Sequence, residues 1–105
     1  MSTRAVIATR MYDETILATY LHFDGYPERI LPILNEGYLD PDEALDLVQG
    51  GELRLLEPRP AEPEYFEDGR PVHELNSDQD LPGLARQMRA GHIYFYDNVW
   101  QHREV

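Results

Sequence analysis

Alternating apolar and polar positions near the N-terminus predict a β-hairpin. The segments Arg4–Arg10 and Thr15–Phe23 are rich in β-branched and aromatic residues, which favour strands. The polar residues 12–14 between them suit a turn. Period-two alternation divides the second strand into one face with Leu17, Thr19, Leu21 and Phe23 and another with Ile16, Ala18, Tyr20 and His22.

Helical spacing replaces this alternation in three later segments. Apolar residues recur every three to four positions in Pro27–Tyr38, where Pro32 should kink or restart the helix because it has no N–H donor. Asp40 as N-cap and proline at the first helical position predict a second helix over Pro41–Gln49. A third helix is expected over Leu81–Ala90, before a glycine.

Two further segments complete the pattern. Residues 57–80 are rich in proline and acids and show no clear period, so a long loop is expected, with a short strand near Tyr65-Phe66. The segments His92–Tyr96 and Val99–Arg103 predict a second hairpin around an Asp97-Asn98 turn. A two-residue turn would place Ile93, Phe95, Trp100 and His102 on its core side.

The order of these elements predicts an α+β fold in a single domain over residues 1–105. The N- and C-terminal hairpins would build a mostly antiparallel sheet, with two to three helices packed on one face. The other face would stay partly open. An open face of this kind serves as a binding platform or as the interface of a homodimer.

Charge adds a functional constraint. Twenty acids oppose nine bases, all of them arginine, and the net charge is −11. Direct binding to nucleic acid is not expected, because contacts to phosphates need a basic surface. Two interpretations of the acids remain: a solvated face that maintains solubility, or a mimic of a polyanion that binds a basic groove on another protein. The candidate acidic surface is Glu36, Asp40, Asp42, Glu43 and Asp46.

The composition also excludes several kinds of chemistry. The absence of cysteine rules out disulfides, thiolate metal sites and cysteine nucleophiles, and favours a reducing cytoplasm. No signal peptide or membrane span is expected. The four histidines show no metal-binding spacing, and no hydrolase or phosphate-loop motif is present, so we predict no metal, no cofactor and no catalytic residue.

One segment concentrates functional side chains where a strand ends and a helix begins. Residues 20–27 read Tyr-Leu-His-Phe-Asp-Gly-Tyr-Pro. Backbone N–H groups at a helix N-terminus attract anions, so a small anionic, nucleotide-type ligand is one candidate. Its predicted binding residues are Arg4, Tyr20, His22, Asp24 and Tyr26. The alternative is structural: Asp24 caps the turn, Gly25 supplies a positive φ, and proline starts the helix.

The same octapeptide, with the opening Ser-Thr-Arg-Ala-Val-Ile-Ala at residues 2–8, resembles a family of small tailed-bacteriophage proteins. Residues 51–56 and the closing tyrosine-rich strand with Trp100 are also similar to that family. Residues 65–70 depart from its pattern, because an acid stands where family members carry arginine. The resemblance implies a bacteriophage origin and the cytoplasm of a bacterial host, and it implies no reaction.

These observations lead to two hypotheses of different classes. The first is an accessory protein that inhibits a host or anti-phage defence function by binding a protein with a basic surface. The second is a ligand-binding module that sequesters a nucleotide-type signal molecule. A small hydrolase is the third and has no motif in its favour. Polyanion mimicry predicts that the acids matter together, whereas sequestration predicts that His22 matters.

Overall fold

The N-terminal hairpin forms the centre of the sheet in the computed structural model, which describes residues 3–68 and 72–105. Strands β1 (Ala5–Arg10) and β2 (Ile16–Leu21) pair antiparallel, with Ala5 opposite Leu21 and Arg10 opposite Ile16. The predicted pairing of these two segments is therefore confirmed. Of the twelve residues in the two strands, nearly all are buried, as expected for strands with neighbours on both sides and both faces.

Within the described ranges, seven strands form one mixed sheet in the order β4-β3-β2-β1-β6-β7, with β5 also paired to β2. The remaining strands are β3 (Leu53–Leu55), β4 (Glu64–Tyr65), β5 (His73–Leu75), β6 (His92–Asp97) and β7 (Val99–Glu104). Four pairings are antiparallel, whereas β1–β6 and β2–β3 are parallel. The two predicted hairpins thus lie side by side through their first strands, and the α+β class is confirmed.

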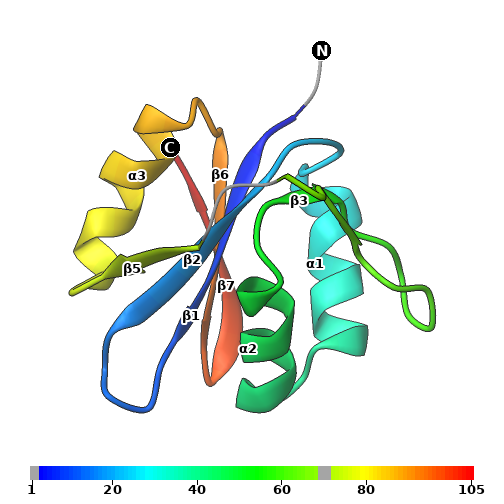
Figure 1. Cartoon of the computed structure of the whole chain (residues 1–105), viewed down its shortest axis with the longest axis horizontal. Coiled ribbons are helices and arrows are strands. Elements are labelled where there is room, and N and C mark those ends of the chain that lie inside the picture. Colours follow the sequence, from blue (N-terminus) through cyan, green and yellow to red (C-terminus); the bar gives the residue numbers. More distant parts are fainter. Residues whose placement is uncertain (1–2, 69–71) are drawn as a thin grey trace.

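Helices cover both faces of the sheet (Figure 1). α1 (Pro27–Gly37) and α2 (Pro41–Gln49) pack on one face, as predicted. α3 (Leu81–Gln87), preceded by the short 3-10 helix η1 (Asp78–Asp80), packs on the face that was expected to stay partly open. The expected binding platform on that face is therefore corrected, because the apolar stripe of α3 covers it.

Two hydrophobic clusters, one on each face, follow the predicted alternation of β2. Leu17 and Leu21 join the cluster under α1 and α2, together with Tyr94, Tyr96 and Trp100. Ile16 and Ala18 join the cluster under α3, together with Ile93 and Phe95. Successive side chains of a strand point to opposite faces, so one strand contributes to both clusters.

The C-terminal hairpin has a register different from the predicted one. Tyr96 pairs with Trp100 and Asp97 with Val99, so Asn98 alone connects the strands, with a φ of 65°. A shift of one residue moves every side chain of a strand to the other face. Trp100 consequently lies with Tyr96 and not with Phe95, and the predicted core side that grouped Ile93, Phe95, Trp100 and His102 is wrong.

Local signals for the helices are mostly confirmed. Asp40 caps α2, since its Oδ1 accepts the N–H of Glu43 at 2.8 Å. α1 runs without interruption through Pro32, so the predicted restart does not occur. Pro32 lies on the exposed side of α1, where water can hydrate the carbonyl that its missing N–H leaves unpaired. Residues 57–80, expected as a long loop, contain β4, β5 and η1, and the short strand near Tyr65 is present.

Among the described residues, no helix has the length and apolar character needed to span a bilayer.

Candidate functional site

A cavity of about 300 Å³ opens at the end of β2, between the sheet and the C-terminal end of α3. We call it the arginine cavity. Three of the five residues predicted to bind a ligand line it, namely Arg4, Tyr20 and His22. Its other lining residues are Glu52, Gln87, Met88 and Arg89. The cavity therefore joins four segments that are distant in the sequence.

His22 has well-defined neighbours in this cavity. Its Nε2 is hydrogen-bonded to the Oε1 of Glu52, which precedes β3. The Tyr20 ring meets the imidazole edge-on, with ring centroids 4.3 Å apart, and the Phe66 ring does so at 4.7 Å. The carboxylate and the two rings fix the position of the imidazole, so any ligand in the cavity meets a pre-oriented side chain.

Tyr20 links the two sides of the cavity, which are formed by β2 and by the end of α3. Its hydroxyl donates to the backbone carbonyl of Met88 at 3.0 Å, which links β2 to the end of α3. Burial raises the pKa of the phenol, so the hydroxyl stays protonated and keeps donating at neutral pH. The remaining lone pair of the Tyr20 oxygen can accept a hydrogen bond.

Asp24 and Tyr26 do not line the arginine cavity, and both side chains are exposed. Asp24, not Gly25, has the positive φ of this turn, at 55°. Gly25 is needed for space instead: its N–H donates to the Thr3 carbonyl at 2.8 Å, and a Cβ there would lie 2.9 Å from that oxygen. Tyr26 is the N-cap residue of α1 but its side chain makes no capping hydrogen bond. The predicted five-residue site is thus divided.

Arg89 is the main residue that the sequence interpretation missed. It follows α3 in a left-handed conformation with a φ of 57°, which turns the chain toward β6. Within the described residues, neither Arg89 nor Arg4 forms an ion pair or a side-chain hydrogen bond. No local pattern connects position 89 with position 22, because only the packing of α3 on the sheet brings them together.

The five acids of the candidate acidic surface lie along the end of α1, the connection to α2, and α2 itself. Glu43 is partly buried and the other four are exposed. Asp40 caps α2, and Asp42 accepts a hydrogen bond from the Tyr12 hydroxyl at 2.9 Å. None of the five forms an ion pair with any residue in ranges 3–68 and 72–105. The surface therefore retains its negative charge.

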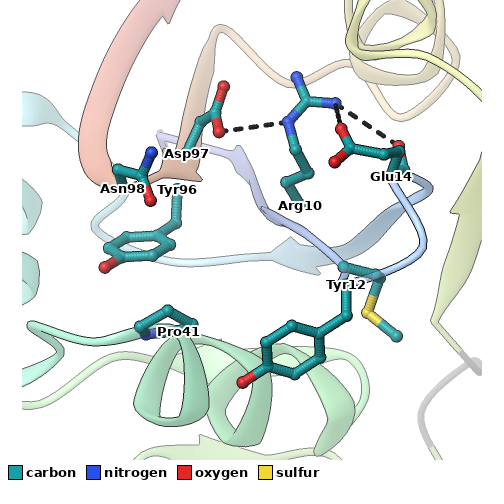
Figure 2. Close-up of a pocket in the computed structure, with 8 residues that line it drawn as sticks. Arg10, Tyr12, Glu14, Pro41, Tyr96, Asp97 and Asn98 are labelled. Atoms are coloured by element: carbon teal, nitrogen blue, oxygen red, sulfur yellow. Dashed lines mark hydrogen bonds and ion pairs between the residues drawn. The ribbon is translucent and has the colours of Figure 1, made fainter.

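A second cavity, of about 250 Å³, lies beside this acidic surface (Figure 2). Its walls come from the β1–β2 turn, the start of α2 and the β6–β7 turn. They include the rings of Tyr12 and Tyr96 and the ring of Pro41, together with Met11. The cavity gives the acidic surface a partly apolar recess.

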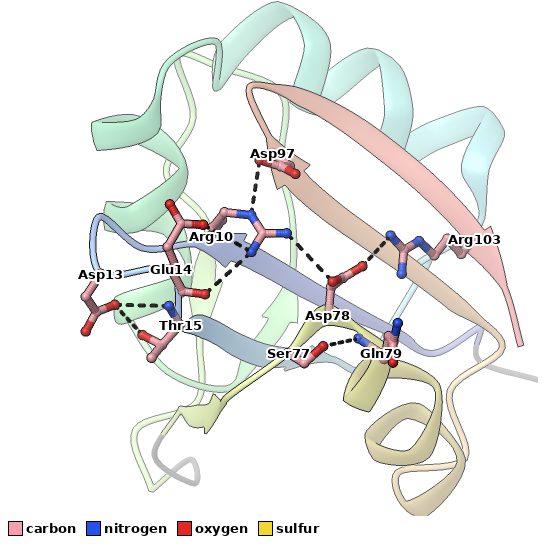
Figure 3. Close-up of polar contacts among 9 residues, drawn as sticks. All are labelled: Arg10, Asp13, Glu14, Thr15, Ser77, Asp78, Gln79, Asp97 and Arg103. Atoms are coloured by element: carbon pink, nitrogen blue, oxygen red, sulfur yellow. Dashed lines mark hydrogen bonds and ion pairs between the residues drawn. The ribbon is translucent and has the colours of Figure 1, made fainter.

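Arg10, at the edge of the second cavity, forms ion pairs with carboxylates of the same chain (Figure 3). Its guanidinium lies 3.2 Å from Asp97 and 3.7 Å from both Glu14 and Asp78. Arg103 also bonds to Asp78, at 3.0 Å, and this bond holds the pKa of the Asp78 carboxyl below its usual value. The network joins the two hairpins to η1, so the positive charge of Arg10 does not offset the acidic surface.

His92 and His102 form an additional pair on β6 and β7, with His92 Nδ1 and His102 Nε2 2.9 Å apart. The Tyr94 ring stacks on His102 with centroids 5.3 Å apart. Burial and the neighbouring His102 lower the pKa of His92, although Glu104 and Glu28 act in the opposite direction. The pair was not predicted, because it depends on the register of the hairpin.

This pair predicts a pH dependence of stability. A histidine whose pKa is lower in the folded state binds fewer protons there than in the unfolded chain, so its contribution is lost as pH falls through about 6.5. The stability of the wild type relative to a His92→Gln variant should therefore decrease between pH 7.5 and pH 5.5. Urea unfolding at both pH values measures this difference, and an unchanged difference would contradict the lowered pKa.

The described residues contain no group of three or more His, Asp or Glu side chains arranged to hold a metal ion. No protein-family model, curated protein or solved structure matches the chain. The fold and the two surfaces described above are therefore the basis for a functional proposal.

Proposed function

We propose that this protein inhibits a host or defence function by binding a basic protein surface, and not by catalysis. One observation carries the proposal: the five acids of the acidic surface gather on α1 and α2, and none is paired with a cation in the described residues. Acids that only stabilise a fold are commonly engaged by neighbouring cations or helix ends. Here Asp40 caps α2 and Asp42 and Glu43 lie in its first turn, whereas Glu36 and Asp46 lie outside the first turn of either helix.

The recess beside the acids supports this proposal. Tyr12 connects the two features, since it lines the second cavity and donates its hydroxyl to Asp42. Tyrosine is enriched in protein interfaces because it combines a large apolar ring with a polar end. A long basic side chain of a partner would place its aliphatic part in the recess and its charge beside the carboxylates.

The resemblance to tailed-bacteriophage proteins suggests where the protein would act and which kind of partner it would bind. A bacteriophage protein of this kind would act in the cytoplasm of the infected bacterium, where basic surfaces of nucleic-acid-binding proteins are abundant. A negatively charged surface competes with nucleic acid for such a site, because both are recognised through their charge.

A charge-reversal experiment tests the acidic surface. Immobilised protein should capture a basic bacterial protein, and mass spectrometry should identify it. The variant Glu36→Lys/Glu43→Lys/Asp46→Lys should then bind the purified partner with an on-rate reduced at least about tenfold, because complementary charge accelerates association. Asp40 is left intact since it caps α2. Wild-type affinity should also fall steeply as salt rises.

A matched control keeps the total charge change the same. The variant Glu67→Lys/Asp68→Lys/Glu74→Lys reverses three exposed acids outside the acidic surface. It should retain an on-rate within about threefold of the wild type at physiological salt, where charges farther apart than about 8 Å are largely screened. Equal losses in both variants, or an affinity that does not change with salt, would refute the proposal.

A further inference from the structure

The geometry points to a second site: the arginine cavity binds a nucleoside phosphate, with Arg4 and Arg89 on the phosphate and the remaining lining residues around the nucleoside. This inference goes beyond the proposed function and does not depend on it. It also revises the sequence-based site, because Asp24 and Tyr26 lie outside the cavity and Arg89 lies inside it.

The disposition of the arginines is the first argument. Arg10, Arg29 and Arg103 have carboxylate partners, and Arg59 lies over the Tyr38 ring at 4.4 Å. Among the described residues, the arginines with neither an ion pair nor an aromatic ring beneath them are Arg4, Arg54, Arg86 and Arg89. Two of these four line the same cavity in a chain with twenty acids. Guanidinium groups bind phosphate through paired, charge-assisted hydrogen bonds, so two of them at one cavity favour a phosphate.

The lining of the cavity indicates a ligand larger than a phosphate ion. A volume of about 300 Å³ lies at the lower end of the range for small-molecule sites and exceeds the needs of a single inorganic ion. The rings of Tyr20 and His22 and the thioether of Met88 offer apolar and polarisable contacts to a planar base. Protein sites for planar ligands commonly combine such contacts with a few polar groups.

The polar residues of the cavity can recognise a nucleoside. Gln87 carries both a donor and an acceptor, as does the edge of a nucleobase. Glu52, which is hydrogen-bonded to His22, also lines the cavity. A carboxylate repels a phosphate, so we place the base or ribose toward Glu52 and the phosphate toward Arg4 and Arg89.

The arginine cavity and the acidic surface lie at opposite ends of β1. Arg4 precedes this six-residue strand, and Tyr12, which bonds to Asp42, follows it. At about 3.3 Å per residue the strand spans roughly 20 Å, which exceeds the screening length at physiological salt. Substitutions in the cavity therefore leave the acidic surface unchanged, and the two proposals can fail separately.

Isothermal titration calorimetry on the full chain tests the cavity. The probes are the four ribonucleoside 5′-monophosphates, the 3′,5′-cyclic forms of AMP and GMP, ribose 5-phosphate and inorganic phosphate. At least one nucleotide should bind with a Kd below 1 mM. Arg4→Gln and Arg89→Gln should each weaken this binding about tenfold or more, because each removes a charge-assisted contact.

Arg86→Gln is the matched control, because Arg86 is exposed on α3, unpaired among the described residues and outside the cavity. It should bind the nucleotide within about twofold of the wild type. Thermal melts verify that all three variants are folded. The proposal is overturned if no nucleotide binds below 1 mM, if Arg86→Gln weakens binding as much as the other two, or if inorganic phosphate binds as tightly as the nucleotides.

Discussion

Replacing Trp100 by alanine should reduce the free energy of unfolding by about 3–5 kcal/mol, the usual cost of removing a large buried aromatic side chain. Trp100 is 8% exposed and packs edge-on against Tyr96, with ring centroids 5.2 Å apart. Its Nε1–H donates to the Tyr38 carbonyl at 2.7 Å, where α1 ends. The substitution leaves a cavity and removes the hydrogen bond that joins β7 to α1.

Urea unfolding followed by circular dichroism measures this loss. Val99→Ala is the matched control on the same strand, because Val99 is 62% exposed and should change the free energy of unfolding by less than about 0.5 kcal/mol. Trp100→Phe should fall between the two, since it keeps an aromatic ring and loses the N–H donor. A loss below 1 kcal/mol for Trp100→Ala would show that the register of the C-terminal hairpin differs from the one described.

Replacing Gly25 by alanine should reduce the free energy of unfolding by about 2 kcal/mol, as overpacking commonly does. The added Cβ would lie 2.9 Å from the Thr3 carbonyl oxygen and 3.0 Å from the Cβ of Ala5. Both atoms belong to the backbone or to a short side chain, so neither can rotate away. Any displacement also disturbs the hydrogen bond from the Tyr94 hydroxyl to the Gly25 carbonyl, at 2.6 Å.

The same substitution at Gly83 should have the opposite effect on the free energy of unfolding. Gly83 lies in α3, and apart from its chain neighbours and the backbone of its own helix no atom lies within 4 Å of an added Cβ. Alanine has a higher helix propensity than glycine, so this variant should gain up to about 1 kcal/mol. Thermal unfolding of both variants should therefore move Tm in opposite directions. A Tm for Gly25→Ala equal to that of the wild type would contradict the close approach at Gly25.

Local signals predicted most of the fold, because they depend on residues close together in the sequence. The alternation in β2 assigned Leu17 and Ile16 to opposite faces, and the Asp40 cap located the start of α2. The sequence does not determine which face of the sheet α3 covers, because the spacing of its apolar residues would be the same on either face. The register error at Trp100 arose from a difference of one residue in a turn.

The candidate ligand site was only partly predictable for the same reason. Tyr20 and His22 belong to one face of one strand, so period-two alternation placed them together. Arg89 and Glu52 reach them through α3 and the segment before β3, and no spacing rule links these positions. Asp24 and Tyr26, which were also predicted for the site, come soon after His22 in the sequence. They lie outside the cavity because the chain turns there to enter α1. The resemblance to bacteriophage proteins stays a prediction.

The parallel pairing of β1 with β6 has a consequence for synthesis of the chain. Ala5 pairs with His92, so β1 acquires its second neighbour only after β6 has been made. At roughly 5–20 residues per second, translation leaves that edge of the hairpin unpaired for several seconds. An open strand edge pairs readily with other chains. Ribosome-bound fragments that stop before β6 should therefore depend on chaperones, whereas chains that include β6 and β7 close the edge themselves.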